Sequence, residues 1–204
     1  MKRLMLFSIL IAVLFVTPSV YAQRYFPLGF GNLALKVDYF RFTDSDLEDL
    51  DLENGVYIGI EGYMALLDTN FYLGMETGWA GTSSDTTGYY DGWRYKTDVD
   101  VDYVPIEFNV KYVFPIDPIM NFGVGAGLSA NYFSINVDGY RYSDSEDDWL
   151  FGGQLFADLN FKMDPWFAGV NVKYQWTDDI ELGDIDTNVS ASNFRAGGQV
   201  GIMF

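Results

Sequence analysis

Apolar and polar residues alternate with a period of two in eight stretches of this chain, a pattern that predicts strands with two unlike faces. The stretches are residues 33–42, 55–64, 71–79, 103–114, 120–133, 149–162, 166–176 and 193–204. In the last stretch one face is apolar and ends on Phe204, while the other carries Arg195 and Gln199. Such strands suit a wall with lipid on one side and a polar interior on the other. A length of 12 residues also exceeds the roughly 9 to 11 that a tilted strand needs to cross a bilayer.

The connections between these strands alternate between long and short. Residues 43–54, 80–98, 134–148 and 177–192 form long connections, and residues 65–70, 115–118 and 163–165 form short turns. This alternation predicts an all-β, eight-stranded, antiparallel up-and-down transmembrane barrel with long extracellular loops, short periplasmic turns and both termini inside. Four tryptophans fall on the apolar face near strand ends, where they predict girdles at the two membrane interfaces: Trp79, Trp149, Trp166 and Trp176.

A soluble barrel of the lipocalin type is the alternative, because it uses the same alternation with the apolar face turned inward. Periodicity alone does not separate the two arrangements. The tryptophan positions, the terminal Phe204 and the balance of charges on the polar face favour the membrane barrel.

The N-terminus has the features of a cleaved secretory signal. Lys2 and Arg3 precede an apolar run over residues 4–16, and a small-residue site ends at Ala22. The run is shorter than the roughly 20 residues of a spanning helix, which disfavours a membrane anchor. We therefore expect a signal peptide over residues 1–22 and one barrel domain over residues 23–204, exported to the cell outer membrane.

Composition excludes several functions. The net charge is −17, and it becomes −19 without Lys2 and Arg3, so nucleic acid is not an expected partner. The chain has no histidine and no cysteine, which excludes Ser/His and Cys/His nucleophile systems and histidine-bearing metal sites. A hydrolase with carboxylates alone stays formally open, but no spacing singles out an acid pair. We expect no enzyme activity and no cofactor.

The polar faces of the predicted strands place five acids and five bases in the barrel interior. They are Lys36, Asp38, Glu61, Glu76, Glu107, Lys111, Asp158, Lys162, Lys173 and Arg195. An eight-stranded barrel is just wide enough to be filled by side chains, and buried charges are costly unless they pair. One interpretation is therefore a structural ion-pair plug. The other is a narrow polar channel along the bare wall that Gly123, Gly125 and Gly127 would leave, although Tyr57, Tyr63, Tyr72 and Phe156 face the same space.

The long connections are acidic. A solvated, self-repelling surface explains this charge, and binding of divalent cations that bridge to lipopolysaccharide phosphates is the functional alternative. Residues 44–49 and 184–188 begin like calcium loops but lack the required glycine. Aromatic residues in the same connections could serve adhesion or hold the loops together: Tyr89, Tyr90, Trp93, Tyr95, Tyr140 and Tyr142.

The segment Val104-Pro105-Ile106-Glu107-Phe108-Asn109-Val110-Lys111-Tyr112 and the final Phe204 resemble the small outer-membrane barrels of the OmpA, OmpX and OmpW kind. The resemblance implies an outer-membrane protein of a Gram-negative bacterium whose terminal Phe204 is read by the barrel-assembly machinery. Because the sequence stops at Phe204, we expect no peptidoglycan-binding domain of the OmpA kind, and the predicted charged interior departs from OmpW.

Together these observations predict a monomeric outer-membrane barrel with a structural or surface-interaction role, in contact with outer-membrane lipid and lipopolysaccharide. Envelope integrity, adhesion and recognition through acidic, aromatic loops are the candidate roles. The competing hypothesis is a narrow porin that passes ions or small polar solutes through a charged lumen.

Overall fold

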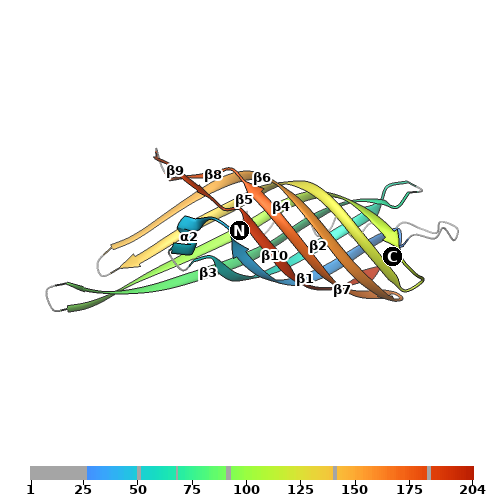
Figure 1. Ribbon diagram of the computed structural model, residues 1–204, viewed down its shortest axis with the longest axis horizontal. Coiled ribbons are helices and arrows are strands. Elements are labelled where there is room, and N and C mark those ends of the chain that lie inside the picture. The colour runs from blue at the N-terminus through green and yellow to red at the C-terminus, as the bar shows by residue number, and fades with distance from the viewer. Residues whose placement is uncertain (1–26, 50–51, 68, 91–92, 140–141, 183–184) are drawn as a thin grey trace, which may run out of the picture.

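The computed structural model describes residues 27–49, 52–67, 69–90, 93–139, 142–182 and 185–204, and the predicted signal peptide lies outside them. Eight antiparallel strands close into one barrel in the order β1-β10-β7-β6-β5-β4-β3-β2. Figure 1 shows this barrel from the side. Their bounds are β1 (Gly31–Phe42), β2 (Asn54–Ala65), β3 (Phe71–Tyr90), β4 (Trp93–Pro115), β5 (Met120–Gly139), β6 (Tyr142–Met163), β7 (Trp166–Thr177) and β10 (Asn193–Met203). Each barrel strand pairs with the next barrel strand along the chain, and β10 closes on β1, so the predicted eight-stranded antiparallel barrel is confirmed.

The two faces of the wall follow the predicted alternation. In β1, Lys36 and Asp38 are each 2% exposed, whereas Leu35 and Val37 are 61% and 58% exposed. Charged side chains thus point into the barrel and apolar side chains point out. This is opposite to a lipocalin, which places its apolar face inward.

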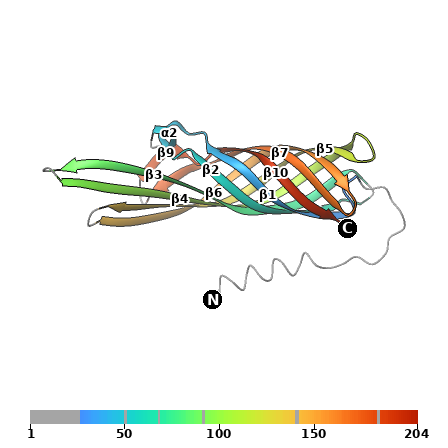
Figure 2. The same ribbon diagram turned by 90° about the horizontal axis from the view of Figure 1, so that it is seen from below.

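Two of the connections predicted as loops are continuations of the strands. The pairing of β3 with β4 runs on to Tyr90 and Trp93, and that of β5 with β6 runs on to Gly139 and Tyr142. β4 and β5 also stay paired as far as Asp98 and Asp138, so the two hairpins form one four-stranded arm that projects from the barrel (Figure 2). The alternation continues at the base of the arm, where Val99 and Ile135 pack against buried apolar residues, but residues 81–88 contain no apolar side chain and therefore show no period of two.

The other two long connections contain α2 (Ser45–Asp49) and the hairpin of β8 (Asp179–Leu182) and β9 (Ile185–Ser190). They are tied together, since the Ser190 amide donates to Asp44 Oδ2 at 2.9 Å and the Thr43 amide donates to the Ser192 carbonyl at 2.8 Å. Residues 45–49, which resemble part of a calcium loop in sequence, form the helix α2. The similar sequence at 184–188 includes Asp184, which lies outside the described residues. In the part of the chain that the structure describes, no helix is long and apolar enough to cross a membrane.

Apolar side chains close the barrel interior at two levels. At the end with the long connections, one cluster joins strand residues to the two tied connections; it comprises Phe40, Phe42, Leu47, Leu52, Tyr57, Ala80, Val101, Tyr103, Phe133, Leu150, Ile180 and Ala191. At the end with the short turns and the C-terminus, a smaller cluster comprises Leu28, Tyr63, Ala65, Tyr72, Val113 and Phe156. The charged residues lie between these two levels.

Candidate functional site

Two acids that face each other across neighbouring strands form the centre of the interior. Glu76 in β3 is paired in register with Glu107 in β4, and the two are 1% and 0% exposed. Like charges directly opposite each other in a sheet repel. The pair therefore needs cations from elsewhere in the barrel.

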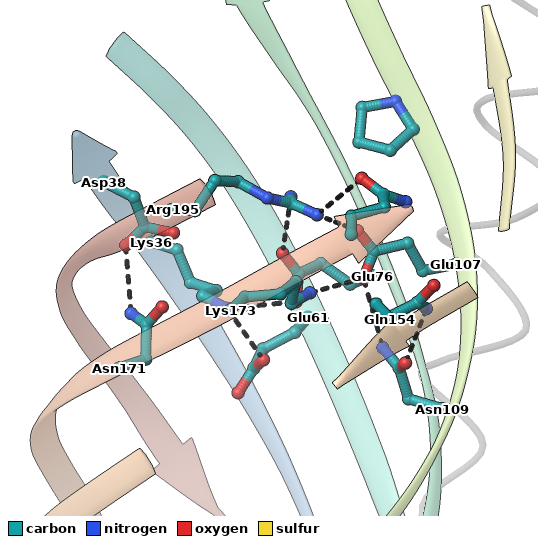
Figure 3. A network of polar contacts seen from close by, with 12 residues as sticks. Lys36, Asp38, Glu61, Glu76, Glu107, Asn109, Gln154, Asn171, Lys173 and Arg195 are labelled. Carbon is teal, nitrogen blue, oxygen red and sulfur yellow. Dashed lines mark hydrogen bonds and ion pairs between the residues drawn. The ribbon is translucent and has the colours of Figure 1, made fainter. Parts of the chain in front are cut away.

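Two bases on the opposite wall supply those cations. Lys173 in β7 and Arg195 in β10 are also paired in register, and both reach across the interior (Figure 3). Lys173 Nζ lies 2.6 Å from Glu76 Oε2, and Arg195 Nη1 lies 3.4 Å from Glu76 Oε1. Each base also forms an ion pair with Glu107. Two acids and two bases thus make a closed four-residue cluster at the core of the barrel.

Two further lysines extend this cluster along the interior. Lys36 Nζ lies 3.0 Å from Glu76 Oε2 and 3.5 Å from Glu61 Oε2. Lys111 Nζ lies 3.9 Å from Glu61 Oε1 and 3.2 Å from Asp158 Oδ2. The eight charged residues therefore form one connected network, because Glu61 and Glu76 each accept more than one cation.

Amide side chains complete the network, and sequence reasoning did not single them out. Gln175 Oε1 accepts hydrogen bonds from Arg195 Nη2 at 3.1 Å and from the Tyr103 hydroxyl at 2.9 Å. Asn171 Nδ2 donates to Asp38 Oδ1 at 2.9 Å, so an amide binds this acid. These amides lie on the same strand face as the charges, and that periodicity is the signal that could have found them.

Nine of the ten charged residues predicted for the interior are buried, and the tenth is not. Lys162 is half-buried and lines a pocket of about 450 Å³ at the turn end, together with Asp164 and Phe204. It shares the inward face of β6, but its position near the end of the strand places it at the rim. The buried charges of the described residues are therefore five acids and four bases, where the sequence predicted five of each.

The glycines of β5 do not leave a bare wall, contrary to the premise of the channel hypothesis. A Cβ at Gly123 would overlap the carboxylate of Asp158, and one at Gly125 would overlap the ring of Phe156. A Cβ at Gly127 would overlap the amides of Asn109 and Gln154. Side chains from β4 and β6 thus occupy the space beside all three glycines.

Aromatic rings lie against the network on both sides. Tyr57, Tyr63, Tyr72 and Phe156, which the sequence placed in the interior, are all buried. The Arg195 guanidinium lies 4.6 Å from the centre of the Tyr57 ring, and Lys111 Nζ lies 3.9 Å from that of Tyr63. The rings of Phe40, Phe42, Tyr103 and Phe133 add a layer that the sequence analysis missed, although they share the strand face of the charges.

The tryptophans predicted for the girdles all lie on the outer face. Their exposed fractions are 48% for Trp79, 52% for Trp149, 54% for Trp166 and 48% for Trp176. At the C-terminus, Phe204 forms two backbone hydrogen bonds of 2.9 Å with Gly31, which extends the closing seam of the barrel to its last residue. The membrane-interface role of the tryptophans and the assembly role of Phe204 stay predictions.

Divalent-cation binding at the acids of the long connections stays a prediction. Among those residues, no group of three or more histidine, cysteine, aspartate or glutamate side chains is arranged to hold a metal ion. Asp100 is exposed and Asp102 is partly exposed on the outer face, where Trp79 Nε1 donates to Asp102 Oδ1 at 2.8 Å. The side chains of the predicted loop aromatics lie outside the described part of the structure.

Comparison with solved structures shows the same fold in distant sequences. Neisserial surface protein A matches with a TM-score of 0.61 at 12% identity, over 86% of this chain and 98% of that protein. A major outer membrane protein of Thermus thermophilus matches with a TM-score of 0.58 at 9% identity, over 85% of this chain and 99% of that protein. No curated protein sequence matches this chain. Residues 8–200 match the family described as the outer membrane protein beta-barrel domain, and the chain belongs to that family.

Proposed function

We propose that this protein is a closed outer-membrane barrel that acts through its extracellular side, in envelope integrity, adhesion or recognition. The filled interior carries this proposal. An ion-pair network lies between two apolar clusters, and the glycine wall that a channel would use is covered by side chains. Because no solute path is apparent among these residues, the part that can meet a partner is the surface outside the membrane.

The extracellular side has features that suit such a role. The short turns and the C-terminus lie at one end, as in outer-membrane barrels with periplasmic turns, so in this proposal the four-stranded arm projects outward from the cell. Acidic side chains on the arm include Asp100, Glu146 and Asp147, all exposed. These charges favour a cationic partner or divalent cations that bridge to lipopolysaccharide phosphates.

The remaining expectations belong to the same proposal. Residues 1–22 direct export and are removed, the assembly machinery reads Phe204, and the mature protein is a monomer in contact with outer-membrane lipid. The name of neisserial surface protein A fits a surface role, although at 12% identity the likeness carries the fold alone.

The test has two parts. The refolded protein in a planar bilayer is expected to give no conductance steps, and steps whose size changes in Glu107→Gln would support the porin hypothesis instead.

A variant in which short turns replace residues 84–97 and 137–144 keeps the barrel and shortens both hairpins of the arm. Cells carrying it should lose attachment to host surfaces or resistance to detergent, relative to cells with the full chain. Unchanged behaviour in both assays, with equal amounts of folded protein, would contradict the surface role of the arm.

A further inference from the structure

The residues before the first strand cross the periplasmic mouth of the barrel. We call Pro27–Phe30 the strap. Its Leu28 is 0% exposed and packs in the apolar cluster with Tyr63, Tyr72, Val113 and Phe156, which belong to β2, β3, β4 and β6. One side chain of the strap thus belongs to the same buried cluster as residues from four strands of the barrel wall.

The backbone of the strap is bound by side chains of the barrel. The Tyr72 hydroxyl accepts a hydrogen bond from the Leu28 amide at 3.2 Å and donates one to the Gly29 carbonyl at 3.0 Å. On β5, Asn121 Nδ2 donates to the Pro27 carbonyl at 2.9 Å. Tyr72 and Asn121 are both fully buried. The hydrogen bonds therefore satisfy polar groups that would be costly to leave unpaired.

The strap can turn across the mouth because residue 29 is glycine. Gly29 has a φ of 72°, a conformation that other residues rarely adopt. A Cβ there would also lie 3.0 Å from the Phe204 carbonyl oxygen and 3.1 Å from the Met203 Cβ. The backbone after Gly29 then continues into β1, and the Ala65 amide donates to the Phe30 carbonyl at 2.7 Å.

We propose that the strap is a stopper that seals the polar interior from the periplasm. Its socket is a binding site for a turned peptide backbone with one leucine-sized side chain, and the chain fills it with its own residues 27–30. Sealing matters because the ion pairs of the interior are stronger when water is excluded. The inference does not depend on the proposed surface function, since it concerns the opposite end of the barrel.

The absence of cysteine from the chain allows a direct test. Val113→Cys places a single thiol in the buried cluster that contains Leu28, and it is a small change at a fully buried position. The rate of its reaction with a charged, membrane-impermeant methanethiosulfonate is measured on the folded full-length protein. Leu67→Cys, at a turn position that is 78% exposed, provides the rate of an open site.

Two substitutions, each added separately to Val113→Cys, weaken the binding of the strap in different ways. Leu28→Ala removes most of the plugging side chain, and Tyr72→Phe removes only the hydroxyl that binds the strap backbone. We expect the Val113→Cys thiol to react more than about tenfold faster with Leu28→Ala and about fivefold faster with Tyr72→Phe. Tyr112→Phe is the matched control, because it removes a hydroxyl from the outward-facing residue beside Val113 on β4 and should leave the rate unchanged.

Either of two results would overturn the proposal. One is a Val113→Cys thiol that reacts as fast as the Leu67→Cys thiol with the strap intact. The other is a rate that neither strap change alters. Retained folding is checked by the migration of the unheated barrel on a detergent gel, and Tyr72→Phe keeps the test decisive if Leu28→Ala does not fold.

Discussion

Replacing one acid of the central four-residue cluster should destabilise the barrel far more than breaking an ion pair at its surface. The change we choose is Glu107→Gln, since glutamine keeps the size of the side chain and removes only its charge. Glu107 is fully buried and pairs with both Lys173 and Arg195. The variant leaves these two cations with less than their full set of partners.

The size of the effect follows from what the cations retain. Removing one partner of a buried ion pair typically costs about 3–5 kcal/mol. Lys173 keeps Glu76 at 2.6 Å, and Arg195 keeps Glu76 at 3.4 Å and Gln175 at 3.1 Å. We therefore expect the lower end of that range, about 3 kcal/mol of the free energy of unfolding.

An exposed ion pair of the same chain is the matched control. Arg41 Nη2 lies 3.3 Å from Glu48 Oε1, with side chains 44% and 60% exposed. Because water solvates both partners, Arg41→Gln should cost less than about 1 kcal/mol. A second control combines Glu107→Gln with Arg195→Met, which removes one charge of each sign. Because the two residues are coupled, the double variant should lose about 2 kcal/mol less free energy of unfolding than the two single variants lose in sum.

Equilibrium unfolding in urea, in lipid vesicles, measures these differences through the fluorescence of the outward-facing tryptophans. If Glu107→Gln and Arg41→Gln lowered the free energy of unfolding by the same small amount, the central cluster would not be a stabilising element. Additive effects of Glu107→Gln and Arg195→Met would mean that the two residues do not act as a pair.

Three other results follow from the packing and the outer surface. Gly125→Ala should lower the free energy of unfolding by about 1–3 kcal/mol, because the new methyl would overlap the Phe156 ring and the Val110 carbonyl. Gly153→Ala, whose Cβ would lie 3.5 Å from its nearest neighbour, should leave stability nearly unchanged in the same urea assay. Leu128→Arg, at a position 73% exposed on the outer face, should lower the free energy of unfolding by about 2–4 kcal/mol. Leu67→Arg, at a turn, should lower it by only about 0–1 kcal/mol. Equal losses would argue against lipid around β5. In vesicles, lipids brominated near the headgroup should quench the outer tryptophans more strongly than lipids brominated at the chain ends, and the reverse order would exclude the interface girdles.

The strands and their two faces could be predicted because a membrane wall imposes a contrast on neighbouring residues. Val37 meets the outside and Asp38 meets the interior, so a period of two appears directly in the sequence. The arm could not be predicted in this way, since residues 81–88 of β3 contain no apolar side chain and so show no alternation. Its pairing, such as Thr87 with Lys96, is held by the backbone and places no comparable demand on side chains.

The pairing of the interior charges could not be predicted from the sequence for a different reason. A period of two says that Lys162 and Lys173 face inward, but not how high each lies along the barrel axis. That height depends on the register of each strand and on the closure of the sheet. It places Lys173 between Glu76 and Glu107, and it places Lys162 at the rim.

β4 and β5 stay paired up to Asp98 and Asp138, so the two hairpins form one continuous sheet and not two separate, independently moving hairpins. β3 continues for 11 residues from Trp79 to Tyr90. At roughly 3.3 Å per residue and a tilt near 40°, this length raises the hairpin about 25–30 Å above the tryptophan level. A disordered segment of similar length would have a fluctuating end, whereas a hydrogen-bonded sheet holds its tip at a nearly constant altitude. In the proposed orientation, an antibody or a host surface approaching the cell would therefore meet this hairpin before it meets the lipid.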